Sequence, residues 1–338
     1  EANKPKETAA LAKLSASQQA QFQKIAKAIP ESDPDARLCL QEMLLDGRLL
    51  KSKDLRGGND LLSNLSKLSD GPMQADLAKE GGKLLGDLIQ EVYDPTCISQ
   101  GSKGTCGATT VQILLAKQNP ADYARLISGL ASPSGKAILA SGAEISRQAG
   151  TEKDDKSCRT LATRLMAPAF MQYGNGIFGY SNEKDETNYH IVKAGGLMNG
   201  QFDGLAEAAL KKDYKAVIVG VTSPAHSVLN DIAKIATPDN PVPISLTYGG
   251  NRLVNDGHFV QITGIKDGKA TFVNPWGRVE SLSQADLEKH IMSAFIPNQR
   301  EGLLGTGSNL VNGVGPAIGI VGELAGGFLD KVKKWWKK

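Results

Sequence analysis

The sequence predicts an α+β fold in which a mainly helical half precedes an antiparallel β half. Up to about residue 213, apolar residues recur at spacings of three and four, as they do on amphipathic helices. From residue 215 to about 283 they fall in short runs rich in Val, Ile, Thr and Phe, separated by Gly, Asn and Asp. Helices followed by strands, without strict alternation, favour two halves that pack against each other.

Residues 1 to 90 predict several short helices joined by Pro and Gly turns. Pro30 ends the first helical segment and Asp33 is an N-cap for the second; the segments are 18–29, 33–50, 61–68 and 77–92. Two interpretations of this N-terminal region stay open. It either supports the rest of the chain as a helical bundle, or it covers a cleft in the next region until it is displaced or cut.

Residues 91 to 300 form the second predicted region, in which helices come first and strands later. The helical segments are 105–118, 121–132, 158–174 and 203–213. The strand segments are 215–223, 243–250, 258–277 and 278–283, and the third contains a tight turn. A cleft between a helical half and a strand half is a natural site for a ligand.

Residues 301 to 338 form a glycine-rich tail with an amphipathic, basic end. Its apolar residues lie close to one helical face and lysines follow them; they are Ile318, Val321, Leu324, Phe328, Val332, Trp335 and Trp336. We expect this face to dock on the body of the protein. The alternative is contact with a membrane surface, which the Trp and Lys residues favour and the glycines disfavour.

Composition argues against several classes of function. The formal net charge is +3, so the chain lacks the broad basic field that nonspecific nucleic-acid binding needs. No run of about eighteen apolar residues predicts a transmembrane helix. The four cysteines include no CxxC pair, and no histidines accompany them at metal-ligand spacing. We therefore expect no metal, no cofactor and no nucleic-acid partner.

The chain begins at Glu1 rather than at Met, and its first residues are too polar for a signal peptide. Removal of an upstream segment would explain this start, as would a cloning boundary. The start tilts the expectation toward a secreted protein, or one delivered to another cell, over a cytoplasmic one. No motif predicts an oligomeric state.

The segment 97–112 contains a cysteine at the point where a helix is predicted to begin. Cys106 stands at this start, and the partial positive charge of free helical amide groups favours a thiolate there. Gln100 lies six residues earlier. Its side-chain amide and the backbone amide of Cys106 are two donors that can bind the oxyanion of an acyl transfer. Cys106 is therefore the candidate nucleophile.

A base for this cysteine must come from one of four histidines: His190, His226, His258 and His290. His258 is the best candidate because it follows a glycine and opens an apolar strand, whereas the others lie beside polar loops or in a helical pattern. Asn274 ends the next β-rich run. If the two runs pair, its side chain can reach the imidazole and hold its tautomer, while Trp276 covers that hydrogen bond from water.

Together, Q-x5-C with glycines, G-H before an apolar strand, and N-P-W-G resemble the motifs of the papain superfamily of cysteine peptidases. The N-P-W-G element resembles the calpain-type branch. The resemblance implies a papain-like two-lobed domain, with a helical lobe and an antiparallel β lobe. It implies Cys106 as nucleophile, His258 as base, Asn274 as the residue that orients the base, and Gln100 as oxyanion donor.

The resemblance also implies an activity and a substrate groove. Members hydrolyse peptide bonds of protein or peptide substrates through a thioester intermediate. A Gly-Gly pair lines the groove in this family, and Gly195 and Gly196 lie between the nucleophile and the base. With Trp276, they are the predicted substrate-binding residues.

Two positions depart from the family pattern, and other activities stay open. The aromatic residue that usually follows the nucleophile is Gly107 here, and Lys103 stands where secreted members often carry a disulfide cysteine. The same constellation also serves deamidases, transglutaminases and isopeptidases, which can act as delivered toxins or effectors. A non-catalytic binding scaffold is the remaining alternative.

Overall fold

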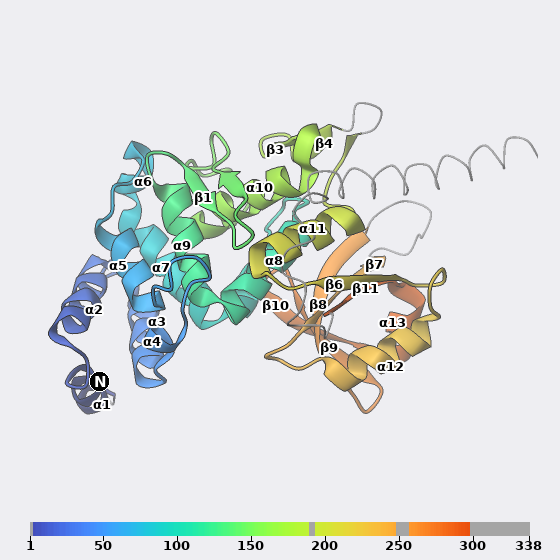
Figure 1. The fold of residues 1–338 in the computed structure, drawn as a ribbon, viewed down its shortest axis with the longest axis horizontal. Coiled ribbons are helices and arrows are strands. Elements are labelled where there is room, and N and C mark those ends of the chain that lie inside the picture. Colours follow the sequence, from blue (N-terminus) through green and yellow to red (C-terminus); the bar gives the residue numbers. More distant parts are fainter. Residues whose placement is uncertain (1–2, 189–192, 248–256, 298–338) are drawn as a thin grey trace, which may run out of the picture.

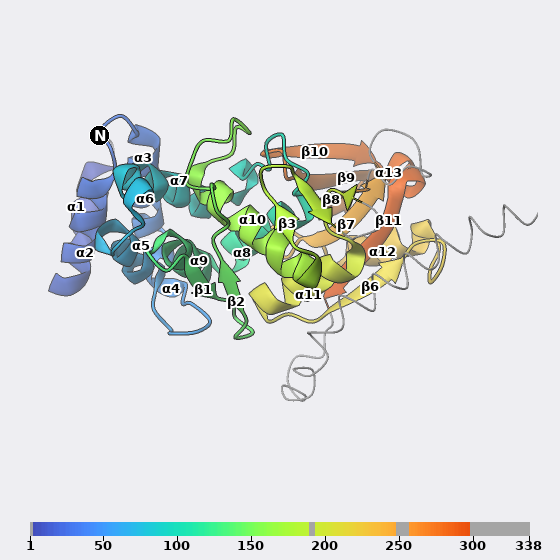
Figure 2. The same cartoon turned by 90° about the horizontal axis from the view of Figure 1, so that it is seen from above.

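A computed structural model of the chain describes residues 3–188, 193–247 and 257–297. The N-terminal helices lie at one end of the molecule and a six-stranded sheet at the other, as the two views in Figures 1 and 2 show. Helix α8, Cys106–Gln118, lies between them. The mixed α+β class is therefore confirmed. The predicted tail at 301–338 lies outside the described residues.

The N-terminal region is helical, as predicted. Side chains cap several of its helices: Ser15 forms a capping box with Gln18, and Asp33 and Asp60 each accept a hydrogen bond from a first-turn amide. The helices are α1 Lys4–Leu11, α2 Ala16–Ala28, α3 Pro34–Leu45, α4 Arg48–Lys51, α5 Leu61–Asp70, α6 Ala75–Lys79 and α7 Gly81–Tyr93.

The helices that follow agree with the predicted segments to within a few residues at most of their ends. They are α8, α9 Pro120–Ala131, α10 Leu161–Asn175 and α11 Asn199–Leu210, with short 3-10 helices η1 Pro95–Cys97 and η2 Gly176–Phe178. Helix α10 continues through Pro168. A proline inside a helix costs about 3 kcal/mol, and the burial of nearly all of α10 offsets that cost.

All six strands of the large sheet are antiparallel, in the order β10-β9-β8-β7-β11-β6. They are β6 Tyr214–Ile218, β7 Val242–Thr247, β8 Gly257–Lys266, β9 Lys269–Asn274, β10 Arg278–Ser283 and β11 Ile291–Pro297. Strands β8 and β9 form a hairpin whose turn residues, Asp267 and Gly268, have φ values of 51° and 69°. Strand β11 inserts between β7 and β6, a pairing that no local sequence pattern predicts.

Helices cover both faces of this sheet. On one face α12 Ala225–Ile235 and α13 Gln284–His290 close a small core with apolar residues of β7, β8 and β9. On the other face α8 and α11 pack against the sheet, and Phe202 of α11 stacks on Phe259 of β8 at 4.6 Å between ring centroids. Neither α12 nor β11 was expected from the sequence.

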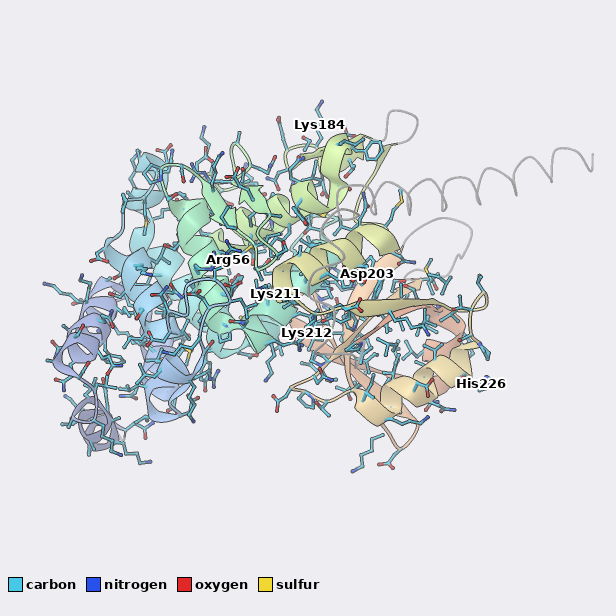
Figure 3. The ribbon with its side chains drawn as sticks, in the orientation of Figure 1. Arg56, Lys184, Asp203, Lys211, Lys212 and His226 are labelled. Atoms are coloured by element: carbon cyan, nitrogen blue, oxygen red, sulfur yellow. The ribbon has the colours of Figure 1, made fainter. Side chains whose placement is uncertain are left out.

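Two small sheets lie on the helical side of the molecule. One consists of β1 Lys136–Ile138 and β2 Glu144–Ser146. The other consists of β3 Tyr180–Ser181, β4 Glu186–Asn188 and β5 Lys193–Ala194, and its exposed tip carries Lys184 (Figure 3). This second sheet leads directly into Gly195 and Gly196.

One continuous hydrophobic core runs from the N-terminal helices to the sheet. It includes residues of α2, α3, α5 and α7 together with residues of α8 to α11, and it ends at Phe259 and Phe295. A buried polar network crosses the same junction, since Glu91 of α7 accepts hydrogen bonds from Tyr123 and Thr163 at 2.5 and 2.9 Å. None of the helices in the described ranges has the length and hydropathy needed to cross a bilayer.

Candidate active site

The candidate nucleophile is the first residue of α8, and a tight loop leads into it. Gly101 in this loop has φ of 58°, and a Cβ atom there would lie 1.8 Å from the carbonyl oxygen of Ser157. Only glycine can therefore occupy position 101 without moving the backbone. The side chain of Thr105 does not cap α8, and the backbone N–H groups of Cys106 and Gly107 bond to the thiol.

The sulfur of Cys106 lies against the first residues of β8. Its Sγ is 3.9 Å from the carbonyl oxygen of Gly257, the residue before His258. Two further bonds join α8 to the same strand: the Thr110 hydroxyl donates to the Phe259 carbonyl at 3.3 Å, and the Gln261 amide donates to the Thr110 carbonyl at 2.6 Å. The packing of α8 on β8 thus brings Cys106 to the backbone on either side of His258, across a long stretch of sequence.

Burial controls the ionisation of the thiol. Cys106 is only 6% exposed, and this burial raises the pKa of its thiol. The backbone N–H groups of Phe259, Gly107 and Cys106 itself oppose the rise, whereas the charge of Asp185 adds to it. An isolated thiolate is therefore disfavoured. A thiolate formed by passing its proton to an adjacent imidazole keeps the pair neutral overall and incurs less of this burial penalty.

His258 and Asn274 form a direct hydrogen bond. Nε2 of His258 and Oδ1 of Asn274 are 2.9 Å apart, and both side chains are buried. The register of the β8–β9 hairpin explains the contact. Gln261 pairs with Val273, and in this register the side chains of His258 and Asn274 lie on the same face of the sheet. Burial lowers the pKa of His258, and the Asn274 bond and the charge of Glu280 oppose this decrease.

Trp276 covers the histidine. Its ring stacks on the His258 ring with centroids 4.6 Å apart and an interplanar angle of 27°. The backbone N–H of Trp276 also donates to Asn274 Oδ1 at 3.3 Å. The Trp276 ring is therefore in position to shield the histidine–asparagine hydrogen bond from water. The substrate-binding role of Trp276 stays a prediction.

The other histidines lie elsewhere. His226 is exposed in the first turn of α12, far from α8 (Figure 3). His290 ends α13, where its Nδ1 lies 3.0 Å from the Thr247 hydroxyl, which is a structural contact. His190 lies outside the described residues.

Gln100 is buried, and backbone contacts join its segment to the segment that contains Asn274. Its backbone N–H donates to the Pro275 carbonyl at 2.7 Å, and its neighbour Ser99 forms a β-bridge with Trp276. The Gln100 side-chain amide donates one hydrogen to the Lys103 carbonyl at 2.7 Å. A primary amide has a second hydrogen, which is the one required at an oxyanion.

The Gly-Gly pair lies beside the nucleophile loop. A Cβ atom on Gly196 would lie 3.6 Å from the Gly104 carbonyl oxygen, and one on Gly195 would lie 3.8 Å from the Asp185 carbonyl oxygen. Gly195 is exposed and Gly196 has φ of 81°. The pair thus presents bare backbone next to Gly104, which is two residues before Cys106.

Asp185 and Lys103 hold this loop in place, and the sequence did not predict this role for either residue. Asp185 accepts from the Gly104 amide and from the Tyr180 hydroxyl, each at 2.7 Å. Lys103 donates to the Asn182 carbonyl at 2.9 Å, so an ammonium group ties the loop to the β3–β4 hairpin. Asp185 lies in a polar stretch with no periodicity, and nothing in the sequence distinguishes it.

The glycine that follows Cys106 has a packing explanation. A Cβ atom at Gly107 would lie 3.2 Å from Cβ of Leu197 and 3.4 Å from Phe259. Leu197 and Phe259 therefore fill the space beside α8, and position 107 has no room for a ring.

Two hollows in the surface of the described residues lie apart from Cys106 and His258. They have volumes of about 430 and 560 Å³ and are lined by other residues. In the described ranges, no group of three or more His, Cys, Asp or Glu side chains is placed to hold a metal ion. All four cysteines are free thiols.

Comparison with known proteins adds no relative to this description. No protein-family model matches the chain, and no curated protein matches it.

Proposed function

We propose that this chain is a cysteine endopeptidase of papain-like architecture. The observation that carries the proposal is that the Cys106 thiol lies against the backbone on either side of His258, whose imidazole is bonded to Asn274. Cys106 begins α8, His258 opens β8 and Asn274 ends β9, with the thiol against the backbone at 257–259 and the imidazole bonded to the amide. A nucleophile, a base and a group that orients the base are the minimum set for acyl transfer through a thiol.

The surrounding fold supports a papain-like arrangement. A helix that begins at the nucleophile lies on an antiparallel sheet that carries the base, with further helices beyond it. Two more residues of the motif set lie close to Asn274. Trp276 stacks on His258 and pairs with Ser99 in a β-bridge, and the backbone N–H of the buried Gln100 donates to the Pro275 carbonyl. Gly195 and Gly196 beside Gly104 support a groove that accepts an extended peptide backbone.

The proposed reaction uses these groups in sequence. The Cys106 proton passes to Nδ1 of His258 as Sγ attacks the peptide carbonyl carbon, and the oxyanion accepts bonds from Gln100 and the Cys106 amide. Collapse of this intermediate breaks the C–N bond, and His258 protonates the departing amine. Water then attacks the thioester with His258 as base, which releases the acid and restores the thiol.

A cleavage screen with reactive-site labelling tests the proposal. We expect the chain to cut members of a mixed peptide library, and Cys106→Ala or His258→Ala to lower cleavage by about a thousandfold or more. Both variants should keep the circular dichroism spectrum of the parent. The matched control is Cys39→Ala, because burial raises the pKa of the Cys39 thiol to about 11 and it lies outside the site.

Other outcomes identify the alternatives. A glutamine mass increase of about one unit without chain scission would make the chain a deamidase instead. Alkylation of Cys106 by iodoacetamide no faster than that of Cys39 at neutral pH would leave only a binding scaffold.

A further inference from the structure

Asn274 has a second polar partner besides His258. Its Nδ2 donates to Oε2 of Glu280 at 2.8 Å, and Glu280 lies on the adjacent strand β10. Glu280 also pairs with Arg278 two residues before it, on the same strand face. The guanidinium of Arg278 in turn lies over the Trp276 ring, 5.3 Å from its centroid. The carboxylate therefore belongs to a chain of contacts that ends on the ring covering the histidine.

Glu280 decides which way the Asn274 amide faces. An amide has an oxygen that accepts and an NH2 group that donates, and the two ends are nearly equal in shape. If the amide were reversed, its oxygen would face the acceptor-only carboxylate of Glu280, and its NH2 group would face the donating N–H of Trp276. Both contacts would be repulsive. The carboxylate thus holds Oδ1 toward Nε2 of His258.

This orientation sets the tautomer of the base. Because Oδ1 only accepts, the proton of neutral His258 resides on Nε2, and Nδ1 is left as the basic nitrogen. Nδ1 is the atom that the proposed reaction requires to take the thiol proton. A reversed amide would accept nothing from Nε2 and would favour the wrong tautomer.

Glu280 also acts on the imidazolium through its charge. Partial burial would raise the pKa of Glu280, but the bonds from Asn274 and Arg278 outweigh this, so its pKa is lowered and it stays ionised. Its negative charge raises the pKa of His258 against the larger effect of burial. From α8, Cys106 lies 3.9 Å from the carbonyl oxygen of Gly257, next to His258, and burial, with a smaller effect of the Asp185 charge, raises the pKa of its thiol.

We propose that Glu280 is a positioning residue of this site, which holds the Asn274 amide in the productive orientation and stabilises the His258 imidazolium. The inference rests on the proposed function. It adds a charged group to a triad whose third member is a neutral amide.

Substitutions at Glu280 test the inference. Glu280→Gln keeps an acceptor for Asn274 and removes the charge, whereas Glu280→Ala removes both. We expect kcat/KM for a cleaved peptide to fall on the order of tenfold in Glu280→Gln, with KM unchanged, and further in Glu280→Ala, as for other groups that orient a histidine. Glu280→Asp should recover part of the activity. Glu144→Gln is the matched control, since Glu144 is an ion-paired strand residue of the separate β1–β2 sheet.

A titration of His258 by nitrogen NMR separates positioning from a structural effect. The pKa of His258 should fall in Glu280→Gln and stay unchanged in Glu144→Gln. An unchanged His258 pKa in Glu280→Gln and Glu280→Ala, with activity lost only in proportion to the folded fraction, would overturn the inference. If the parent chain cleaves no peptide, the proposed function fails, but the His258 titration and the rate of Cys106 alkylation still decide the role of Glu280.

Discussion

The candidate site has two sides, named after their proposed roles: the nucleophile side around Cys106 and the base side around His258. They are built in different ways. His258, Asn274 and Glu280 are held by strand register, so backbone pairing of β8, β9 and β10 brings their side chains together. Cys106 is held by a loop and a helix start that have no repeating pattern. Its position depends on single contacts, such as the fit of Gly101 against Ser157 and the bond from Gly104 to Asp185.

The difference shows how each side tolerates change. Many backbone hydrogen bonds hold the register of β8, β9 and β10. One substitution on the base side therefore changes the chemistry of the site more than the positions of its side chains. A loop has no such redundancy, and one lost contact moves the sulfur. We therefore expect substitutions on the nucleophile side to affect stability and activity together, and those on the base side to affect mainly activity.

The largest expected effect comes from removing residues 1 to 90. The core that surrounds α8 continues into α2, α3, α5 and α7, so the truncation exposes apolar faces of α8, α9 and α10. We expect an insoluble or molten chain, measured by expression yield, near-ultraviolet circular dichroism and dye binding. This outcome favours the N-terminal region as a support. A folded truncated chain that cleaves peptides faster would instead show that the region covers a cleft.

Gly101→Ala should be the most damaging single substitution on the nucleophile side. The new Cβ would overlap the Ser157 carbonyl, so we expect the free energy of unfolding to drop by about 4 kcal/mol and cleavage to be lost. Gly58→Ala is the control, because Gly58 has a similar φ of 67° with nothing within 4 Å of the added atom. It should cost only about 1 kcal/mol, from the backbone strain alone. Equal costs in urea unfolding would contradict the close fit.

The buried carboxyl of Glu91 should make the helical side sensitive to pH. Burial raises its pKa from 4.5 to about 7, so the folded state favours the neutral form. The contribution of Glu91 to the free energy of unfolding is fully present below pH 4.5 and is lost as pH rises toward 7. The loss amounts to roughly 3 kcal/mol. Glu91→Gln should remove this loss, so it gains stability over the parent at pH 8 relative to pH 5. Urea unfolding at both values measures it, with Glu144→Gln as the control.

Lys103→Ala should have the smallest effect. It removes the bond to the Asn182 carbonyl on the β3–β4 hairpin, worth about 0.5–1 kcal/mol, and should slow cleavage a few-fold. Lys184→Ala removes a lysine at the exposed tip of the same hairpin and should change neither thermal midpoint nor rate (Figure 3). If the two variants behave alike, Lys103 does not fasten the loop.

Some features of the site could be read from the sequence because they follow local rules. A tight turn between the β-rich runs around His258 and Asn274 was predicted, and the register of the hairpin in the structure brings the two side chains to one face. The cysteine at a helix start was likewise a local pattern. The helical periodicity of the N-terminal region predicted its helices for the same reason.

The sequence by itself determined the α+β class, most of the helices and the tight turn between β8 and β9, because periodicity and turn chemistry act between neighbouring residues. Only the tertiary structure decided the rest: the insertion of β11 between β7 and β6, the continuity of the core with the N-terminal helices, and the contacts of Asp185 and Glu280. These depend on which surfaces meet after the elements have formed. Burial of apolar area and pairing of buried polar groups select such contacts across the whole chain, and no short stretch of sequence records them.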